Sequence, residues 1–294
     1  MGSFVEVNKR SLVVRVENRK TKKWLRDHPS ARNFRGKIRR FSKSSQKRLA
    51  RIISNNAERF QYFFTVTYRK NVRDCKISKV HIDRFLTRFR KACSSIVGYV
   101  WVLEFQKRGA VHFHIWFDEF EVERFPEWLN LTVRKQILHR FKGNEKNIER
   151  FRFLTYLWLV VTGQLGDEKA VRAATDLKVI VSCKFIKGYA VKYAWKEEQK
   201  EFEGNVDLTT GEILDYWTGR FWGGSRSVKN EKLFYSEDIS DVRTFRRWLR
   251  SNRRLKNFSG TWISWNEELR KRIIKMGNDL KLGQVIRNWQ NGDL

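Results

Sequence analysis

The chain has 294 residues and a formal net charge of +30 at pH 7, from 62 Lys and Arg against 32 Asp and Glu. Hydrophobic residues make up 41% of it and aromatic residues 14%, so the chain can bury a core and is too apolar to be disordered. Such an excess of positive charge destabilises a compact chain unless a polyanion is bound. Nucleic acid is therefore the leading partner, and an anionic membrane the weaker one.

Several other classes of protein are excluded. The longest strongly apolar run, Phe153–Val161, is far shorter than the about 20 residues of a membrane-spanning helix. The N-terminus lacks the apolar segment of a secretory signal, and the cysteines show no zinc-ligand spacing, so we expect reduced thiols and a cytoplasmic protein. No GxxxxGK[ST] loop occurs, so no nucleoside triphosphate is expected.

The sequence divides into three regions, 1–58, 59–228 and 229–294. The first is a basic arm, because residues 1–51 carry 17 Lys and Arg against 3 Asp and Glu. Such an arm is either a solvated tail or a phosphate-binding segment, since clustered cations release counterions from DNA. We expect the second role for it.

The last region is expected to be helical and basic. Arginines between residues 243 and 254 recur at spacings of three and four beside an apolar stripe that includes Phe245 and Trp248. This pattern predicts a helix whose basic side follows DNA phosphates, with Arg246 and Arg250 among the contacts. A solvated helix face is the alternative.

The middle region predicts an α+β fold, in which an antiparallel central sheet carries flanking helices. Its β-branched and aromatic segments predict strands at 62–68, 99–105, 111–117 and 178–185. Ser78 is expected to cap the first helix, and Pro126 to open a helix that runs to about Phe141. Further helices are expected at 147–162 and 187–203, with a break at 163–166.

Candidate metal ligands lie on the two strands that flank a short turn. Residues 107–109 suit a three-residue hairpin loop with Gly109 in the left-handed conformation. That register places Glu104 opposite His112, and His114 shares the face of His112 because side chains alternate along a strand. The three side chains are expected to converge on one patch.

Two imidazoles and a carboxylate are suitable ligands for a divalent cation. Mixed nitrogen and oxygen ligation favours Mn²⁺, with Mg²⁺ tolerated. Zinc is the alternative metal for three protein ligands and an open position. Paired histidines that simply face solvent are the alternative without a metal.

Residues 187–196 carry two tyrosines and two lysines at helical spacing. Tyr189 and Tyr193 fall on one face, and Lys192 and Lys196 each follow a tyrosine by three residues. A phenol with a pKa near 10 is a poor nucleophile at neutral pH, but a neighbouring ammonium helps to ionise it and steadies a phosphate. Two half-buried tyrosines on an amphipathic helix are the alternative.

Three motifs occur in an order typical of a known superfamily. They are Phe63-Phe64-Thr65-Val66-Thr67, His112-Phe113-His114 and Tyr189-Ala190-Val191-Lys192-Tyr193. They resemble the FLTLT-type strand, the His-hydrophobic-His pair and the YxxKY helix of rolling-circle replication initiators of the HUH endonuclease superfamily. The two tyrosines are similar to those of its phage and prophage branch. Weaker similarities lie at Trp158, Thr162-Gly163 and Gly219–Gly223, and the resemblance spans about residues 60–225.

The resemblance implies a ferredoxin- or RRM-like palm that nicks single-stranded DNA at a replication origin and later rejoins the ends. A tyrosine, Tyr189 or Tyr193, attacks phosphorus and forms a 5′-phosphotyrosine, with Lys192 on the phosphate. Glu104, His112 and His114 hold the divalent metal. Lys107, Arg108 and Lys196 contact the DNA, and host helicase and polymerase complete replication, because no helicase domain is present.

Three alternative interpretations stay open. In the first, only one of the two tyrosines is a nucleophile. The second is a single-strand transposase of the HUH type, against which the doubled tyrosine argues. The third is a basic nucleic-acid-binding protein without catalysis, in which the paired histidines are incidental.

Overall fold

The computed structural model describes residues 3–8, 11–15, 41–93, 95–106, 108–122, 131–132, 134–182, 184–186, 188–189, 219–228, 232–251, 260–263, 268 and 271–280. The chain forms two compact units. Residues 1–36, 47–56 and 229–294 make up the first, which we call the terminal unit. Residues 37–46 and 57–228 make up the second, the central unit.

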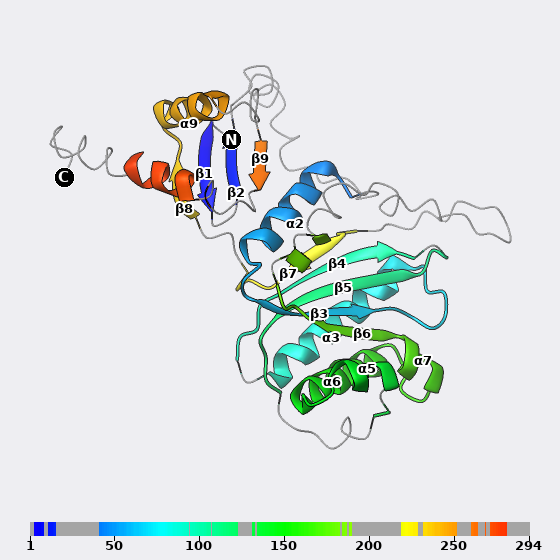
Figure 1. Ribbon diagram of the computed structural model, residues 1–294. Helices are drawn as coiled ribbons and strands as arrows, with labels where there is room; N and C mark the ends of the chain where they lie inside the picture. The colour runs from blue at the N-terminus through cyan, green and yellow to red at the C-terminus, as the bar shows by residue number, and fades with distance from the viewer. Residues whose placement is uncertain are drawn as a thin grey trace, which may run out of the picture. The chain divides into compact units, whose positions relative to one another are not determined.

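The central unit is built on a sheet with the strand order β6-β3-β5-β4-β7 (Figure 1). All neighbouring strands in it run antiparallel. The strands are β3 (Phe60–Val66), β4 (Tyr99–Phe105), β5 (Val111–Asp118), β6 (Thr175–Val179) and β7 (Trp222–Gly224). With helices beside it, this antiparallel sheet confirms the α+β class that the sequence predicted.

The hairpin strands β4 and β5 form where they were predicted, but β6 does not. We expected that strand at 178–185, whereas β6 ends at Val179 and residues 184–186 are helical. β6 pairs with β3 as far as Val179 opposite Tyr62, close to the first residue of β3. The strand β6 therefore ends close to the point where its partner β3 begins, although apolar residues occur beyond it.

Helices cover one face of this sheet through an aromatic core. They are α3 (Cys75–Ala92), α5 (Lys135–Arg140), α6 (Glu145–Val161) and α7 (Glu168–Ala173). Phe85 of α3 stacks on Phe64 of β3 at a centroid distance of 6.0 Å, and Trp158 of α6 meets Phe113 of β5 at 6.3 Å. Side chains alternate across a strand, so His112, the neighbour of Phe113, belongs to the opposite face.

The N-terminus of α3 is capped by a different residue from the one we predicted. The Asp74 carboxylate accepts from the backbone N–H of Lys76 at 2.6 Å and of Ile77 at 3.3 Å. Ser78 lies one turn further on, buried, and its hydroxyl donates to the Cys75 carbonyl at 3.1 Å. The prediction was wrong because an acceptor closer to the start of the helix satisfies the free N–H groups.

The helix expected to run from Pro126 to Phe141 is also shorter. Residues 131–132 are not helical and α5 begins after Arg134, while Pro126 itself lies outside the described residues. The predicted break after α6 is confirmed, since Gly163 adopts a positive φ of 66°, which glycine tolerates at a helix end.

The terminal unit joins segments from both ends of the chain. Its sheet has the strand order β8-β1-β2-β9. Its strands and helix are β1 (Phe4–Asn8), β2 (Ser11–Arg15), β8 (Lys232–Ser236), β9 (Gly260–Ile263) and α9 (Ile239–Ser251). The buried residues Val242 and Phe245 of α9 share a core with Val5 and Leu12. Helix α2 (Lys43–Asn55) is divided between the units.

The sequence analysis treated the two chain ends as separate regions, an arm and a helical segment. In the structure, β1 of the first region pairs with β8 of the last, and β2 pairs with β9. Pairing between segments so distant in the sequence leaves no local signal. Strands of the arm and strands of the C-terminal region therefore form one sheet.

Among the described residues, no helix combines the length and the apolar character that crossing a bilayer requires.

Candidate functional site

The β4–β5 hairpin has the register that its turn predicted. Gly109 adopts a φ of +82°, and the Gln106 N–H donates to the Ala110 carbonyl at 2.9 Å. Glycine takes this left-handed conformation without the steric cost that other residues meet. Glu104 consequently lies opposite His112, as expected.

His114 is the most firmly held of the predicted ligands. Its Nε2 lies 3.1 Å from Glu104 Oε2, and its Nδ1 lies 3.0 Å from the Thr65 hydroxyl of β3. The Glu104 and His114 side chains are both buried, at 8% and 7% exposure. Contacts at both ring nitrogens fix the plane of the imidazole. In the tautomer that binds a cation through Nε2, Nδ1–H donates to Thr65.

His112 is half-buried and contacts a residue that the sequence analysis did not single out for the site. Its Nδ1 lies 3.3 Å from Nε2 of Gln106, whose Oε1 accepts from the Arg108 guanidinium at 2.9 Å. Arg108, predicted to contact DNA, also donates to the backbone carbonyls of Tyr68 at 2.7 Å and Arg69 at 3.2 Å. It therefore fastens the hairpin turn to the chain that follows β3.

The donors of Glu104, His112 and His114 fit a divalent cation in kind, because such ions bind oxygen and imidazole nitrogen. The 3.1 Å between Glu104 and His114 matches the about 3 Å between ligands set at right angles about 2.1 Å from one ion. The two imidazole centroids are 4.5 Å apart. Among the described residues, however, no group of three such side chains converges on one point as placed.

Tyr189 lies in a helical turn at residues 188–189 and is enclosed by aromatic rings. Its ring centroid lies 4.4 Å from that of Phe63, 5.0 Å from Phe185, 6.0 Å from Trp116 and 6.2 Å from His114. Phe63, His114 and Trp116 all belong to the face opposite α3 and α6. The phenol therefore lies on the same side of the sheet as the candidate ligands.

The electrostatics around Tyr189 keep its phenol protonated. Burial raises its pKa above the ordinary value of 10.0, and the carboxylates of Glu104 and Asp176 raise it further. Attack by this oxygen therefore requires a neighbouring group that removes its proton or stabilises the phenolate.

The structure does not describe every predicted site residue. The side chains of Lys107, Lys192, Tyr193, Lys196 and Arg250 lie outside the described residues. Arg246 is half-buried in α9, in the terminal unit. The roles expected of all of them stay predictions.

The sheet face that carries the candidate ligands continues across the sheet to the edge strand β6. Thr65 of β3 pairs with His114 of β5 on one side and with Asp176 of β6 on the other. Directly opposed residues point to the same face. A row of polar side chains thus runs from the hairpin strands to the edge strand β6.

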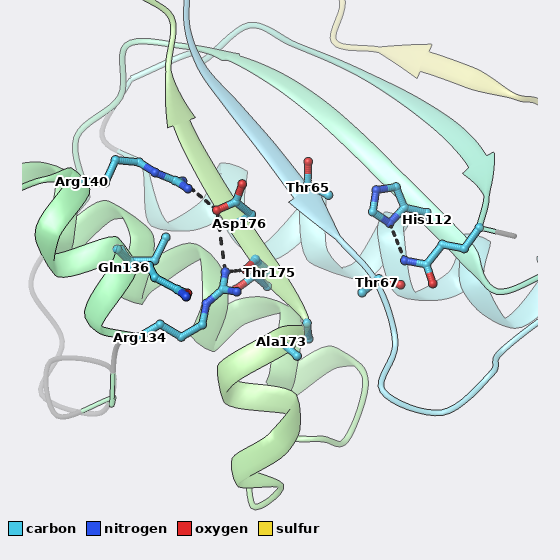
Figure 2. Close-up of a pocket in the computed structure, with 12 residues that line it drawn as sticks. Thr65, Thr67, His112, Arg134, Gln136, Arg140, Ala173, Thr175 and Asp176 are labelled. Atoms are coloured by element: carbon cyan, nitrogen blue, oxygen red, sulfur yellow. Dashed lines mark hydrogen bonds and ion pairs between the residues drawn. The ribbon is translucent and has the colours of Figure 1, made fainter. Parts of the chain in front are cut away.

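A pocket of about 360 Å³ opens at that edge, beside His112. Figure 2 shows His112 on one side and the side chains of Arg134 and Arg140 on the other, with Thr65 and Thr67 between them. The remaining lining residues are Gln106, Gln136, Ile137, Ala173, Ala174, Thr175 and Asp176.

The two arginines are held by the edge strand. Arg134 donates to the Thr175 carbonyl at 2.7 Å, and Arg140 donates to the Leu177 carbonyl at 2.6 Å (Figure 2 shows the first). Asp176 Oδ1 lies 2.7 Å from the Arg140 guanidinium and 3.7 Å from that of Arg134. One carboxylate thus lies between two cations, which leaves this wall of the pocket positive.

Sequence reasoning missed the pocket residues and the supporting contacts. Thr65 was noticed as part of a motif, and its register against His114 could have been found by aligning two strands. Gln106 could have been found as the residue before the turn. Arg134, Arg140 and Asp176 carry no such signal, because the packing of α5 against β6 brings them together.

Comparison with known proteins agrees with the sequence resemblance. Residues 61–198 match the model of a family described as replication-associated protein ORF2/G2P, which is consistent with a rolling-circle replication initiator. No curated protein and no solved structure matches the chain significantly. The match covers the β4–β5 hairpin, the pocket and Tyr189, and the second tyrosine stays a prediction. Residues 61–198, slightly less than half of the chain, are therefore similar to replication-associated proteins of the ORF2/G2P family.

Proposed function

We propose that the protein initiates rolling-circle replication by nicking single-stranded DNA at an origin and later rejoining the ends, with Tyr189 as a nucleophile. The observation that carries the proposal is the position of its phenol. The Tyr189 ring lies 6.2 Å from that of His114, which contacts Glu104. A nucleophile beside a set of metal-type donors suits attack on a phosphodiester.

Glu104, His112 and His114 would hold a divalent cation, Mn²⁺ or Mg²⁺. When bound, the ion supplies Lewis acidity that neutralises charge on the scissile phosphate. The chain's own contribution is to fix the donors. Thr65 orients His114 by a contact to Nδ1 that leaves Nε2 beside Glu104, and Gln106 holds the ring of His112 by a contact to its Nδ1.

Tyr189 would attack the phosphorus through its phenolic oxygen. The new bond joins that oxygen to the 5′ phosphate, the bond to the 3′ oxygen breaks, and the released 3′-OH takes up a proton. The proton lost from the phenol balances the one that the 3′ oxygen gains, and the raised pKa of Tyr189 means that another group must assist its removal. The phosphotyrosine retains the energy of the broken linkage, so rejoining needs no nucleoside triphosphate.

Other parts of the proposal rest on the sequence. Tyr193 would serve a second round of cleavage, and Lys192 would bind phosphate. Lys107, Arg108, Lys196, Arg246 and Arg250 would contact the DNA. The free 3′-OH would prime a host polymerase, with a host helicase unwinding the duplex in the cytoplasm.

Covalent trapping from a random library tests the proposal and does not require the origin sequence. Purified protein is mixed with Mn²⁺ and a labelled library of random single-stranded oligonucleotides, and adducts that survive SDS are isolated and sequenced. We expect an adduct that needs the cation and is enriched in one sequence. Tyr189→Phe should abolish or strongly reduce it.

The matched control is Tyr156→Phe, which removes the same hydroxyl from α6 on the opposite face of the sheet. This variant should form the adduct at the normal rate. DNA binding without any adduct in the unaltered protein would instead support the non-catalytic alternative and contradict the proposal.

A further inference from the structure

Most of the residues that line the pocket beside His112 have no part in the chemistry proposed above. It shares Thr65 and His112 with the candidate site, and extends from them to Arg134 and Arg140 at the edge of the sheet. Its volume of about 360 Å³ lies at the low end of the about 300–1,000 Å³ typical of small-molecule sites. A ligand in it would be no larger than about one nucleotide.

The charges of the pocket favour an anion. Arg134 and Arg140 together outweigh the single carboxylate of Asp176. The Nε of Arg134 is buried and finds no hydrogen-bond partner among the described residues. A buried guanidinium N–H is costly to leave unpaired, and phosphate oxygens are well matched to the geometry of arginine donors.

The other lining side chains suit a sugar–phosphate backbone better than a stacked base. They present the hydroxyls of Thr65, Thr67 and Thr175 and the amides of Gln106 and Gln136, and no Phe, Tyr or Trp among the described residues lines the pocket. Proteins that hold unpaired bases without sequence readout usually stack them on aromatic side chains. Hydroxyls, amides and guanidinium groups are the donors typical of backbone contacts to DNA.

We propose that this pocket binds one nucleotide of the single-stranded substrate next to the scissile phosphate, with Arg134 and Arg140 holding its backbone phosphate. The inference rests on the proposed function, because it takes the substrate to be single-stranded DNA. The row His114–Thr65–Asp176 connects the two sites across neighbouring strands. Asp176 keeps the two guanidinium groups in place between the strand edge and the ligand.

Binding of single strands tests the pocket independently of catalysis. The probe is a labelled oligothymidylate of about 20 nucleotides, titrated by fluorescence anisotropy at several salt concentrations. Arg140→Gln should weaken binding about tenfold, the scale of one charge-assisted hydrogen bond, and lower the salt slope by about 0.7. Arg88→Gln makes the same charge change on the exposed side of α3 and should leave both quantities nearly unchanged.

A second variant avoids the strand contacts that Arg140 makes. Gln136 is exposed at the pocket, so Gln136→Trp should fill the cavity without disturbing the fold. It should weaken oligothymidylate binding about as much as Arg140→Gln does, at an unchanged melting temperature. Leu138→Trp, on the same helix but outside the pocket, is its control.

The outcomes separate this inference from the proposed function. Normal oligothymidylate binding by both Arg140→Gln and Gln136→Trp overturns the pocket assignment, whatever the adduct assay gives. Weakened binding in both, with normal controls, supports the assignment even if Tyr189→Phe leaves the adduct unchanged.

Discussion

Two parts of the sheet face that carries the candidate ligands differ in how they are built. In the β4–β5 hairpin, Glu104, His112 and His114 belong to one local structure whose turn ends at Gly109. At the β6 edge, Asp176 meets Arg140 of the separate element α5 and Arg134, the residue that precedes it. The first is a local structure and the second a tertiary one.

Under the proposed function, the two parts would serve different tasks, metal binding at the hairpin and phosphate binding at the β6 edge. A hairpin fixes its side chains through register and turn, which suits donors to one ion. The arginines at the β6 edge donate to backbone carbonyls of β6, so their positions depend on the docking of a helix against a strand. We expect changes at the hairpin to affect the chemical step and changes at the edge to affect binding.

Removal of a hairpin donor should have the largest effect. His114→Ala deletes the ring that contacts Glu104 and Thr65, and should lower the rate of adduct formation by more than about a hundredfold. Oligothymidylate binding should change little. His139→Ala, an exposed histidine outside the pocket, is the control. A normal rate in His114→Ala would contradict the metal site.

Loss of the supporting contacts should have a smaller effect on the same step. Thr65→Val keeps the shape of the side chain but removes the hydroxyl 3.0 Å from His114 Nδ1. The rate of adduct formation should fall about 10- to 100-fold and recover partly at higher Mn²⁺ concentration. Thr65→Ser retains the hydroxyl and should stay near normal. Equal rates of adduct formation in Thr65→Val and Thr65→Ser would contradict the proposal that the Thr65 hydroxyl positions His114.

The turn allows the hairpin to be loosened without deleting a donor. Gly109 has a φ of +82°, and a Cβ there would lie 3.1 Å from Arg73 Nε. Gly109→Ala should therefore lower the free energy of unfolding by about 1–2 kcal/mol in urea denaturation. The control is Gly166→Ala, where an added Cβ meets nothing within 4 Å. Equal stability of the two variants would show that the turn does not constrain the hairpin.

The last prediction concerns Lys79, which lies beside the outer strand β7. Its Nζ donates to the Arg220 carbonyl and lies 4.3 Å from the centroid of the Trp101 ring. Burial lowers the pKa of Lys79 from 10.5 to about 7. Between these values the folded chain binds fewer protons than the unfolded one, so Lys79 makes stability rise with pH in that window.

Urea midpoints measured at about pH 7 and about pH 9 test this behaviour. The unaltered protein should gain more stability over that range than Lys79→Met does. Lys76→Met, which changes a neighbouring exposed lysine, should gain as much as the unaltered protein. A gain in Lys79→Met equal to that of the unaltered protein would contradict the lowered pKa.

The sequence could predict features that depend on residues close together in the chain, such as turns and the alternation of side chains along a strand. Gly109 in a short loop fixes the register of Glu104 against His112, and alternation along β5 places His114 with them. Ser78 was mistaken for a helix cap because Asp74, a better acceptor, stands four residues before it.

Other features depend on contacts between distant segments. β6 ends at Val179 because its partner β3 begins nearby, although the apolar run continues to Phe185. The pairing of β1 with β8 and the meeting of Arg134 with Asp176 arise in the same way. Hydrophobic periodicity carries no signal of them, so the pocket could not be found before the fold was known.

The most direct test of the account is the identification of the residue that carries the DNA. The covalent adduct is digested with nuclease and protease, and its peptides are sequenced by mass spectrometry. We predict a 5′-phosphodeoxynucleotide on the peptide that contains Tyr189, attached to its phenolic oxygen. An adduct found only on other residues would contradict the central claim that this phenol attacks the phosphate.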